Sequence, residues 1–248
     1  APPNYAIKGT SVDMAFKPTA PNGTDSMTTP ERLARNNIIL LVCLLALVLL
    51  YPLFEYENSL VRDLLITAIL FSGVYSLEFS AHSRKLLLPL AWLTVITTWA
   101  NHFINTRLMT MIDFGTTSFT LAVIVLLMIR HIARSRVVTR TIILNAINGY
   151  ILLGVVGAAL FNIANGAHIL LHGAGSAGIL MPDGSVPEFS DYLYLSFITL
   201  TTVGYGDIIA VSHMTRPIAI FIGLSGQLYM TILIAMLVGK FLAGNERQ

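Results

Sequence analysis

The segment TLTTVGYGD, residues 199–207, lies between two long apolar runs of the chain. It holds three threonines, two glycines on either side of a tyrosine, and a final aspartate. A soluble protein places such a turn-forming segment on its surface. In a membrane protein, irregular backbone is tolerated only where it is buried in protein or lines a water-filled path. The class of the protein therefore decides what this segment does.

The composition indicates a membrane protein. Of the 248 residues, 11% are charged and 55% are hydrophobic, whereas soluble domains have about 25% charged residues. The net charge of +2 gives no support for a nucleic-acid partner. Cys43 is the one cysteine, so an intramolecular disulfide is excluded. We predict an all-α protein that crosses the membrane several times.

Six segments are long and apolar enough to cross a bilayer, which takes about 20 residues. They are 37–54, 61–79, 85–104, 115–132, 141–165 and 215–242. Residues 1–36 predict a flexible cytoplasmic tail, with Thr29-Pro30-Glu31 as a helix start near its end. We expect a four-helix transmembrane domain over 37–133 and a pore domain over 134–248.

The distribution of lysine and arginine predicts the topology. With the N-terminus in the cytoplasm, twelve of the fifteen fall on the inner side, and three fall outside. The outer three are Arg62, Arg107 and Arg216, and the inner twelve are Lys8, Lys17, Arg32, Arg35, Arg84, Lys85, Arg130, Arg134, Arg136, Arg140, Lys240 and Arg247. This asymmetry follows the positive-inside rule and predicts that both termini are cytoplasmic.

The topology places TLTTVGYGD in a loop that enters from the outside. Residues 166–213 are too polar to span the membrane, and they leave and rejoin it on the outer side. With Ser190 as N-cap and Asp191 in the first turn, we predict a pore helix over 190–201 after a turret over 166–189. The re-entrant loop then continues as 202–206, and such a loop is tolerated where it lines a pore.

Backbone geometry explains the two glycines of this loop. A dehydrated cation needs several oxygens at once, and successive carbonyls facing one axis would supply them. An ordinary strand alternates its carbonyls between two sides. Aligning them requires alternating backbone conformations that glycine adopts without penalty, which accounts for Gly204 and Gly206. The hydroxyl of Thr202 can add an oxygen at the inner end.

TTVGYGD resembles the selectivity filter of tetrameric potassium channels, in which four such loops form one pore. The resemblance extends to FSDYLYLSFITLTTVGYGDI and to GLSGQLYMTILIAMLVGKF, and it covers about residues 141–243. The four preceding spans are similar to six-span bacterial channels in architecture alone. The resemblance implies a potassium-selective channel in a prokaryotic plasma membrane, built as a homotetramer, with K⁺ as permeant ion and no other cofactor.

The resemblance also implies roles for individual residues. The ion-coordinating filter would be Thr202, Val203, Gly204, Tyr205 and Gly206, with K⁺ held by the first four. Tyr205 would point away from the ion and pack against Tyr194 and Phe197, while Thr201 and Asp207 flank and support the filter. Three positions depart from common family patterns, namely Ile198, Tyr194 and Ala210. They leave the coordinating oxygens unaffected and leave filter inactivation open.

The last span offers candidates for a gate. Gly226, with Gly223 before it, lies where many relatives have a flexible hinge, although glycine also serves close helix packing. Gln227, Met230 or Thr231, and Ile234 recur at helical spacing, so they either line an inner cavity or form a buried stripe.

The fourth span does not look like a voltage sensor. Residues 114–129 carry no charge, whereas a sensor needs arginines inside the span. Four arginines cluster at its cytoplasmic end: Arg130, Arg134, Arg136 and Arg140. They either bind anionic lipid or belong to a solvated linker. We expect gating by lipid, tension, pH, filter ions or the N-terminal tail, because no further domain follows the last span.

Other functions are less well supported by the residues. The chain has no carboxylate pair, nucleophile–base set or phosphate loop, which argues against an enzyme. His168 and His172 are four residues apart but lack a third metal ligand. A potassium-transporter subunit and a non-conducting scaffold or sensor with a pore fold remain as alternatives.

Overall fold

The computed structural model describes residues 29–54, 59–76, 81–104, 106–135, 139–173 and 176–245, and within these ranges the chain is mostly helical. The helices are α1 (Thr29–Leu45), α2 (Tyr51–Phe54), α3 (Ser59–Tyr75), α4 (Ala81–Ile104), α5 (Arg107–Arg134), α6 (Arg140–His172), α7 (Phe189–Leu200) and α8 (Thr215–Asn245). A π-helical turn, η1 (Ala46–Leu50), joins α1 to α2, and two short strands are β1 (Ile179–Leu180) and β2 (Ile209–Ala210).

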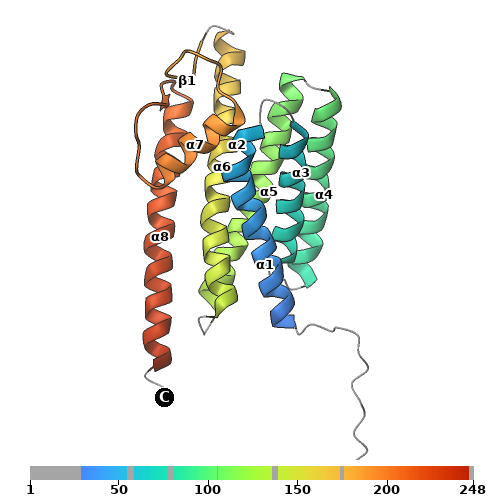
Figure 1. The fold of residues 1–248 in the computed structure, drawn as a ribbon, viewed down its shortest axis with the longest axis vertical. Coiled ribbons are helices and arrows are strands. Elements are labelled where there is room, and N and C mark those ends of the chain that lie inside the picture. The colour runs from blue at the N-terminus through green and yellow to red at the C-terminus, as the bar shows by residue number, and fades with distance from the viewer. Residues whose placement is uncertain are drawn as a thin grey trace, which may run out of the picture.

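The long helices run side by side (Figure 1). Helices α1, α3, α4 and α5 form one bundle, and α6 packs against α5 and α1 on its edge. Helix α8 lies on the far side of α6, and the short α7 lies against both. The bundle of α1, α3, α4 and α5 therefore packs onto α6 of its own chain.

Among the described residues, five helices have the length and composition to cross a membrane: Glu31–Leu53, Leu87–Ile104, Leu108–Arg134, Arg140–His172 and Thr215–Gly239. Together with the helical content, they confirm an all-α membrane protein. The remaining long helix, α3, has 17 residues and packs between α1 and α4.

Several helix boundaries differ from those predicted. Helix α1 begins at Thr29, so residues 29–36 are helix and not tail; residues 1–28 lie outside the described part. Helix α6 continues seven residues past the predicted end, through Asn165 and Gly166 to His172, and the Asn165 side chain bonds to Tyr192 and Gly178 there. Gly173 takes a φ of 94°, which ends the helix. The turret accordingly begins at Gly173 and not at residue 166.

Local sequence explains where the helices begin and where α1 is distorted. The hydroxyls of Thr106 and Thr139 accept hydrogen bonds from the backbone N–H of Met109 and Ile142, and so cap α5 and α6. Pro52 has no N–H for the carbonyl four residues earlier. The π-helical turn η1 ends two residues before Pro52, and the backbone N–H of Tyr51 donates to the carbonyl of Ala46.

Helices α4 and α5 meet through hydroxyl groups. Thr94 and Thr120 are hydrogen-bonded at 2.7 Å, and Thr97 and Thr116 at 2.8 Å. Such small polar residues let helices approach closely in a membrane. Toward the end where α5 begins, the buried Asp113 accepts a hydrogen bond of 2.6 Å from Thr98. This interface is polar although both helices are apolar overall.

An aromatic joint connects the four-helix domain to the start of the pore helix α7. The ring of Phe189, the first residue of α7, lies 5.4 Å from that of Phe114 on α5 and 6.0 Å from that of Tyr51. The Arg62 guanidinium lies over Phe114 at 5.6 Å and pairs with the buried Asp63 at 2.9 Å. Helix α7 is thus held at its first residue by α5 and by α2.

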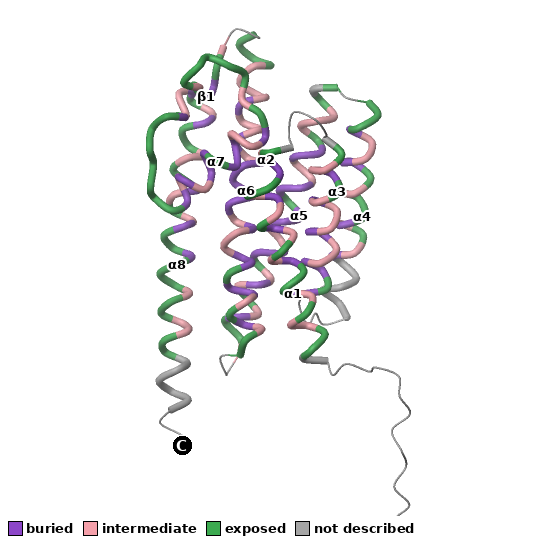
Figure 2. Tube along the Cα trace, in the orientation of Figure 1, coloured by how far each residue is buried: buried purple, intermediate pink, exposed green. Residues whose placement is uncertain are grey.

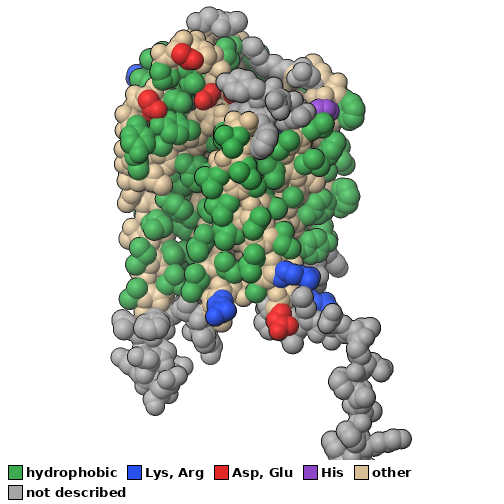
Figure 3. Space-filling view, in the orientation of Figure 1, with side chains coloured by type: hydrophobic (Ala, Val, Ile, Leu, Met, Phe, Trp, Pro, Cys, Tyr) green, Lys and Arg blue, Asp and Glu red, His purple; other side chains and the backbone are tan. Residues whose placement is uncertain are grey.

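A second joint lies near the other end of the molecule. Asn148 on α6 donates to the carbonyl of Asn37 on α1 at 2.9 Å, and Asn37 donates to the carbonyl of Ser76 at 2.9 Å. Figure 2 shows that buried residues are concentrated where α6 meets α5 and α7, while much of α8 is exposed. On the face in Figure 3, Lys and Arg gather mainly at the end where α1 begins, and acids mainly at the opposite end.

Candidate ion pathway

The candidate pathway starts with the pore helix α7, whose N-terminus differs from the prediction. The N-cap is Glu188 and not Ser190, and the helix covers Phe189–Leu200. The carboxylate of Asp191, at the third helical position, accepts a hydrogen bond of 2.8 Å from the backbone N–H of Glu188. This reciprocal spacing of two acidic residues forms a capping box and fixes the start of α7.

Polar contacts with α6 fix the depth of α7. The Ser196 hydroxyl donates to the carbonyl of Gly154 at 2.7 Å. The amide of Asn165 donates to the hydroxyl of Tyr192 at 2.8 Å. Helices can pass this closely because Gly154 has no side chain: a Cβ there would lie 2.5 Å from the ring of Phe197. These contacts therefore hold α7 against α6 along its length.

The C-terminal end of α7 reaches the middle of the helix bundle. The hydroxyl of Tyr150, about ten residues into α6, lies 3.5 Å from the carbonyl oxygen of Leu200. Gly226 of α8 faces the same carbonyl, and a Cβ on Gly226 would overlap it. The partially negative end of α7 thus lies at mid-height, where it favours a cation.

The backbone of the filter segment alternates in handedness. Thr202, Gly204 and Gly206 have φ of 61°, 51° and 80°, while Val203 and Tyr205 between them have ordinary negative values. The two glycines therefore occupy the conformation for which the sequence argument required them. Thr202 was not expected there. It is the one non-glycine residue with positive φ in the described part of the chain, and a β-branched residue in this region is strained.

Hydrogen bonds hold the strained segment against α7 and α8. The backbone N–H of Thr202 donates to the carbonyl of Thr199 at 3.1 Å, and that of Gly204 to the carbonyl of Ile198 at 3.1 Å. The amide of Gln227 on α8 lies 3.4 Å from the Thr202 hydroxyl. Gln227, which the sequence suggested for an inner cavity, therefore lies beside the inner end of the filter.

The filter is open to the outside of the single chain. All residues from Thr201 to Asp207 are exposed, with Val203 at 52% and Tyr205 at 74%. Tyr205 was predicted to pack against Tyr194 and Phe197. In the single chain the Tyr205 ring is largely exposed and Phe197 points toward Gly154 of α6, so this packing stays a prediction.

Tyr194 has a different partner, Asp207, directly after the filter. The Tyr194 hydroxyl donates to the Asp207 carboxylate at 2.7 Å. This hydrogen bond lowers the pKa of Asp207 and raises the pKa of Tyr194 to about 12. Because the pKa of the acid is lowered and that of the phenol raised, the bond contributes fully between about pH 4 and about pH 10, and it is lost as the pH rises through about 12. It joins the outer end of the filter to the pore helix.

Replacing Tyr194 by phenylalanine removes this bond while keeping the ring. We expect Y194F to form a folded protein whose ion flux decays with time after the start of the assay, because the outer end of the filter loses its tie to α7. The decay should be the same at pH 5 and pH 9, since the pair does not titrate between them. Time-resolved flux from reconstituted vesicles measures it, and a stable wild-type-like flux would contradict this role of the bond.

The loops around the filter are tied to each other and to α6. Strands β1 and β2 pair antiparallel, with Ile179 opposite Ala210. The backbone N–H of Gly178 donates to the Asn165 side chain at 3.0 Å, and the Thr215 hydroxyl donates to the carbonyl of Gly178 at 2.6 Å. The turret and the segment after the filter therefore form one unit on top of α6 and α8.

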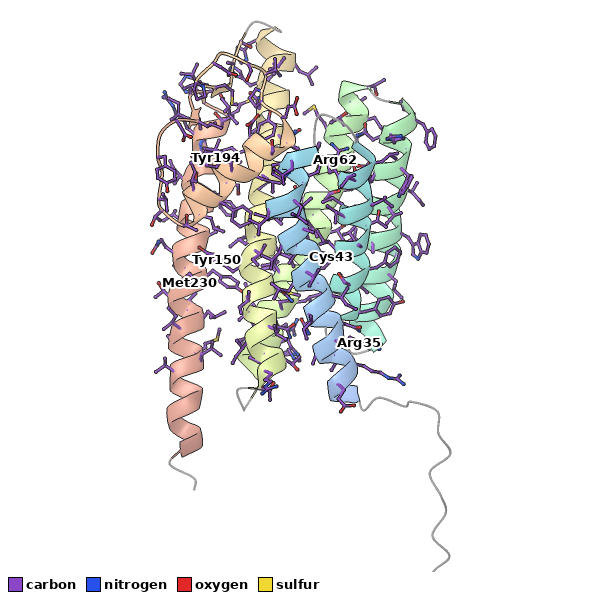
Figure 4. All side chains as sticks on the ribbon, viewed as in Figure 1. Arg35, Cys43, Arg62, Tyr150, Tyr194 and Met230 are labelled. Atoms are coloured by element: carbon purple, nitrogen blue, oxygen red, sulfur yellow. The ribbon has the colours of Figure 1, made fainter. Side chains whose placement is uncertain are left out.

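The other candidate residues of α8 lie on its exposed side. Met230 and Ile234 are 41% and 52% exposed within the chain, and Figure 4 shows Met230 on α8 below the level of Tyr194. Gly223 is in ordinary contact with the carbonyl of Thr199, 3.8 Å from where its Cβ would be. Gly226, by contrast, has a packing reason for being glycine, and its role as a hinge stays a prediction.

The two histidines considered as metal ligands lie together near the end of α6. His168 and His172 both belong to α6, and their rings stack at 4.4 Å. The Nδ1 of His172 is already 3.1 Å from the carbonyl of His168. No group of three or more His, Cys, Asp or Glu suited to a metal occurs in the described part of the chain.

Sequence reasoning overlooked most residues that anchor the pore helix. Ser196, Tyr192 and Asn165 were not among the predicted site residues, although each pairs across the α6–α7 interface. A signal was available, because the small residues Gly154 and Ala158 are four residues apart in an apolar helix. Small residues at this spacing indicate close packing of another helix.

Comparison with known proteins supports this assignment for part of the chain. Residues 167–243 match a family model described as ion channel, and this range contains the turret, α7, the filter and most of α8. No curated protein and no solved structure matched the chain. The matched range is the part that forms the candidate pathway, and it supports an ion channel.

Proposed function

We propose that the protein is a potassium-selective channel that conducts K⁺ passively through the carbonyls of Thr202, Val203, Gly204 and Tyr205. The observation that carries the proposal is the alternation of positive φ at residues 202, 204 and 206. This alternation turns successive carbonyls toward one side, and they can then replace the hydration shell of a cation. The C-terminal end of α7 adds a favourable potential at mid-membrane.

The proposal requires four copies of the chain. One filter loop cannot surround an ion, and the exposed filter leaves its open face for identical neighbours. In the tetramer, Tyr205 packs against the pore helix of an adjacent subunit, which would cover the ring that is 74% exposed in the single chain. The topology is that of six spans, with α3 as the second, a re-entrant α7–filter segment and both termini in the cytoplasm.

We further propose that the channel lacks a voltage sensor of the usual kind. Between Arg107 and Arg130, the one Asp, Glu, Lys or Arg residue of α5 is the buried acid Asp113. A conventional sensor carries arginines at these positions to move charge through the membrane field. Steep voltage dependence of the open probability in planar bilayers would contradict this part of the proposal.

An isotope-flux assay tests the main proposal. Liposomes that hold the purified protein and are loaded with K⁺ are expected to take up external ⁸⁶Rb⁺, driven by the outward K⁺ gradient. Ba²⁺ should block this uptake, and the uptake of ²²Na⁺ should be small. Native mass spectrometry of the same sample should give four chains. A folded tetramer without any flux would favour a scaffold or sensor, and equal Na⁺ and Rb⁺ uptake would contradict K⁺ selectivity.

A further inference from the structure

An apolar cavity lies between α5, α6 and α8, away from the filter. It has a volume of about 350 Å³, within the size range of small-molecule sites. Its walls are almost entirely aliphatic and aromatic: Ala122, Val125, Leu126, Ile129 and Ile132 on α5, Leu153 and Val156 on α6, and Phe221, Ser225, Leu228, Tyr229, Ile232, Leu233 and Met236 on α8. We call this cavity the α5–α8 groove.

The groove is open on one side and long. Leu126, Phe221, Leu228 and Ile232 on its walls are each at least half exposed. Its α8 residues run from Phe221 to Met236. At about 1.5 Å per residue this is roughly 22 Å, more than the roughly 15 Å of one hydrocarbon leaflet. An extended acyl chain fits these dimensions, and the groove has few polar atoms to hold water.

Positive charge surrounds the inner end of the groove. Ile132 packs there with Ile142 and Met236. Arg130 and Arg134 on α5 and Arg140 on α6 are within about one turn of these residues and are exposed. None of the three has an ion pair or side-chain hydrogen bond with the described part of the chain. Arg136, predicted as part of the same cluster, lies outside the described residues.

Charge complementarity identifies the occupant. A second copy of the chain would bring the same arginines, and of its described acids only Glu31 lies at this end of the bundle. An anionic phospholipid brings a phosphate for the arginines and hydrocarbon for the groove in one molecule. Basic pockets between transmembrane helices on the cytoplasmic side bind such headgroups.

We infer that the α5–α8 groove is a binding site for an anionic phospholipid of the cytoplasmic leaflet. The headgroup contacts Arg130, Arg134 and Arg140, and one acyl chain lies along α8 between Phe221 and Met236. The assignment to the cytoplasmic leaflet rests on the topology in the proposed function. Because α8 forms one wall, a bound chain holds α8 apart from α5 and so contacts the helix that carries the candidate gate.

Lipid retention measures the site directly. The full chain is exchanged into nanodiscs of mixed phosphatidylglycerol and phosphatidylcholine and purified in detergent, and the co-purifying lipid is quantified by mass spectrometry. We expect phosphatidylglycerol to be retained in preference to phosphatidylcholine. In R130Q/R134Q its apparent affinity should fall about 30-fold, since each basic residue near a charged surface contributes about 1 kcal/mol.

The chain offers a matched control for this charge removal. Arg32 and Arg35 are exposed at the same end of the molecule but belong to α1, away from the groove. R32Q/R35Q removes the same charge and should retain phosphatidylglycerol like the wild type. An equal loss in both double variants would mean general surface attraction and would overturn the site. Equal retention of phosphatidylglycerol and phosphatidylcholine by the wild type would overturn the proposed site as well.

A second pair of variants tests the apolar part. S225F fills the groove from α8 and leaves the arginines in place, so it should also reduce phosphatidylglycerol retention, with an unchanged circular dichroism spectrum as the control for folding. S225C tests a protein occupant instead. An intersubunit disulfide through S225C in lipid-filled nanodiscs would mean that a second copy covers the groove, and the lipid site would then be wrong.

These binding measurements do not depend on conduction. A protein that retains phosphatidylglycerol but passes no Rb⁺ would refute the proposed channel and leave the lipid site intact. A protein that conducts Rb⁺ without retaining phosphatidylglycerol selectively would refute the lipid site and leave the proposed channel intact. Coupling to α8 is tested by flux: added phosphatidylglycerol should change Rb⁺ uptake of the wild type and of R32Q/R35Q, but not of R130Q/R134Q.

Discussion

Replacing Gly204 or Gly206 by alanine is expected to abolish K⁺ conduction while the protein still folds. Both glycines have positive φ, at 51° and 80°, and a Cβ at either position would meet no atom within 4 Å in the chain. The effect therefore comes from the backbone conformation and not from crowding inside one subunit. An alanine held in the left-handed region costs about 1–2 kcal/mol.

In the proposed tetramer this cost occurs in each of four subunits that share one filter. The sum of about 4–8 kcal/mol is enough to reduce the population of the conducting filter by more than about 100-fold. The measurement is Rb⁺ uptake by reconstituted vesicles, together with native mass spectrometry to show that four chains remain. Wild-type uptake with K⁺ selectivity intact in G204A would refute the assigned role of the alternating backbone.

Gly184 provides the matched control. It has a φ of 72°, it is exposed in the turret, and a Cβ there would also meet nothing within 4 Å. G184A therefore imposes the same kind of backbone strain at a distance from the filter. We expect it to lower the thermal stability slightly and to leave Rb⁺ uptake unchanged. Equal loss of uptake in G184A and G204A would mean that the strain acts on folding and not on the ion pathway.

Much of the arrangement was predictable because it depends on local sequence. Long apolar runs predict spanning helices, and the short run before TTVGYGD predicts a pore helix that ends within one residue of Leu200. The two filter glycines were predictable because the conformation they need is a property of single residues. A candidate for the ion pathway could be named in this way before any contact was known.

The contacts between distant residues could not be predicted in the same way. Phe189 reads as an ordinary apolar residue, and its position between Tyr51 and Phe114 depends on how two bundles pack. Glu188 was overlooked as N-cap because serine at position 190 has the stronger intrinsic preference. The strain at Thr202 is imposed by neighbouring segments, since nothing in the residue itself favours a positive φ.

Gly226 shows how the structure separates two explanations that the sequence left open. As a hinge, it would supply flexibility when α8 bends during opening. As a packing residue, it lets α8 pass close to the end of α7, where a Cβ would overlap the carbonyl oxygen of Leu200 and lie 2.9 Å from its Cδ1. Gly226 is buried, and the contact is with backbone, which cannot rotate away as a side chain can.

We therefore expect G226A to destabilise the protein, whereas a pure hinge substitution would alter gating alone. Forcing a methyl group into a packed interface costs about 1–3 kcal/mol, which lowers the melting temperature by roughly 5 °C in a chain of this size. G223A is the matched control, because its Cβ would lie at an ordinary 3.8 Å from the Thr199 carbonyl oxygen. Thermal unfolding in detergent measures both. An unchanged melting temperature in G226A, combined with altered flux, would assign Gly226 to the hinge and refute the packing role.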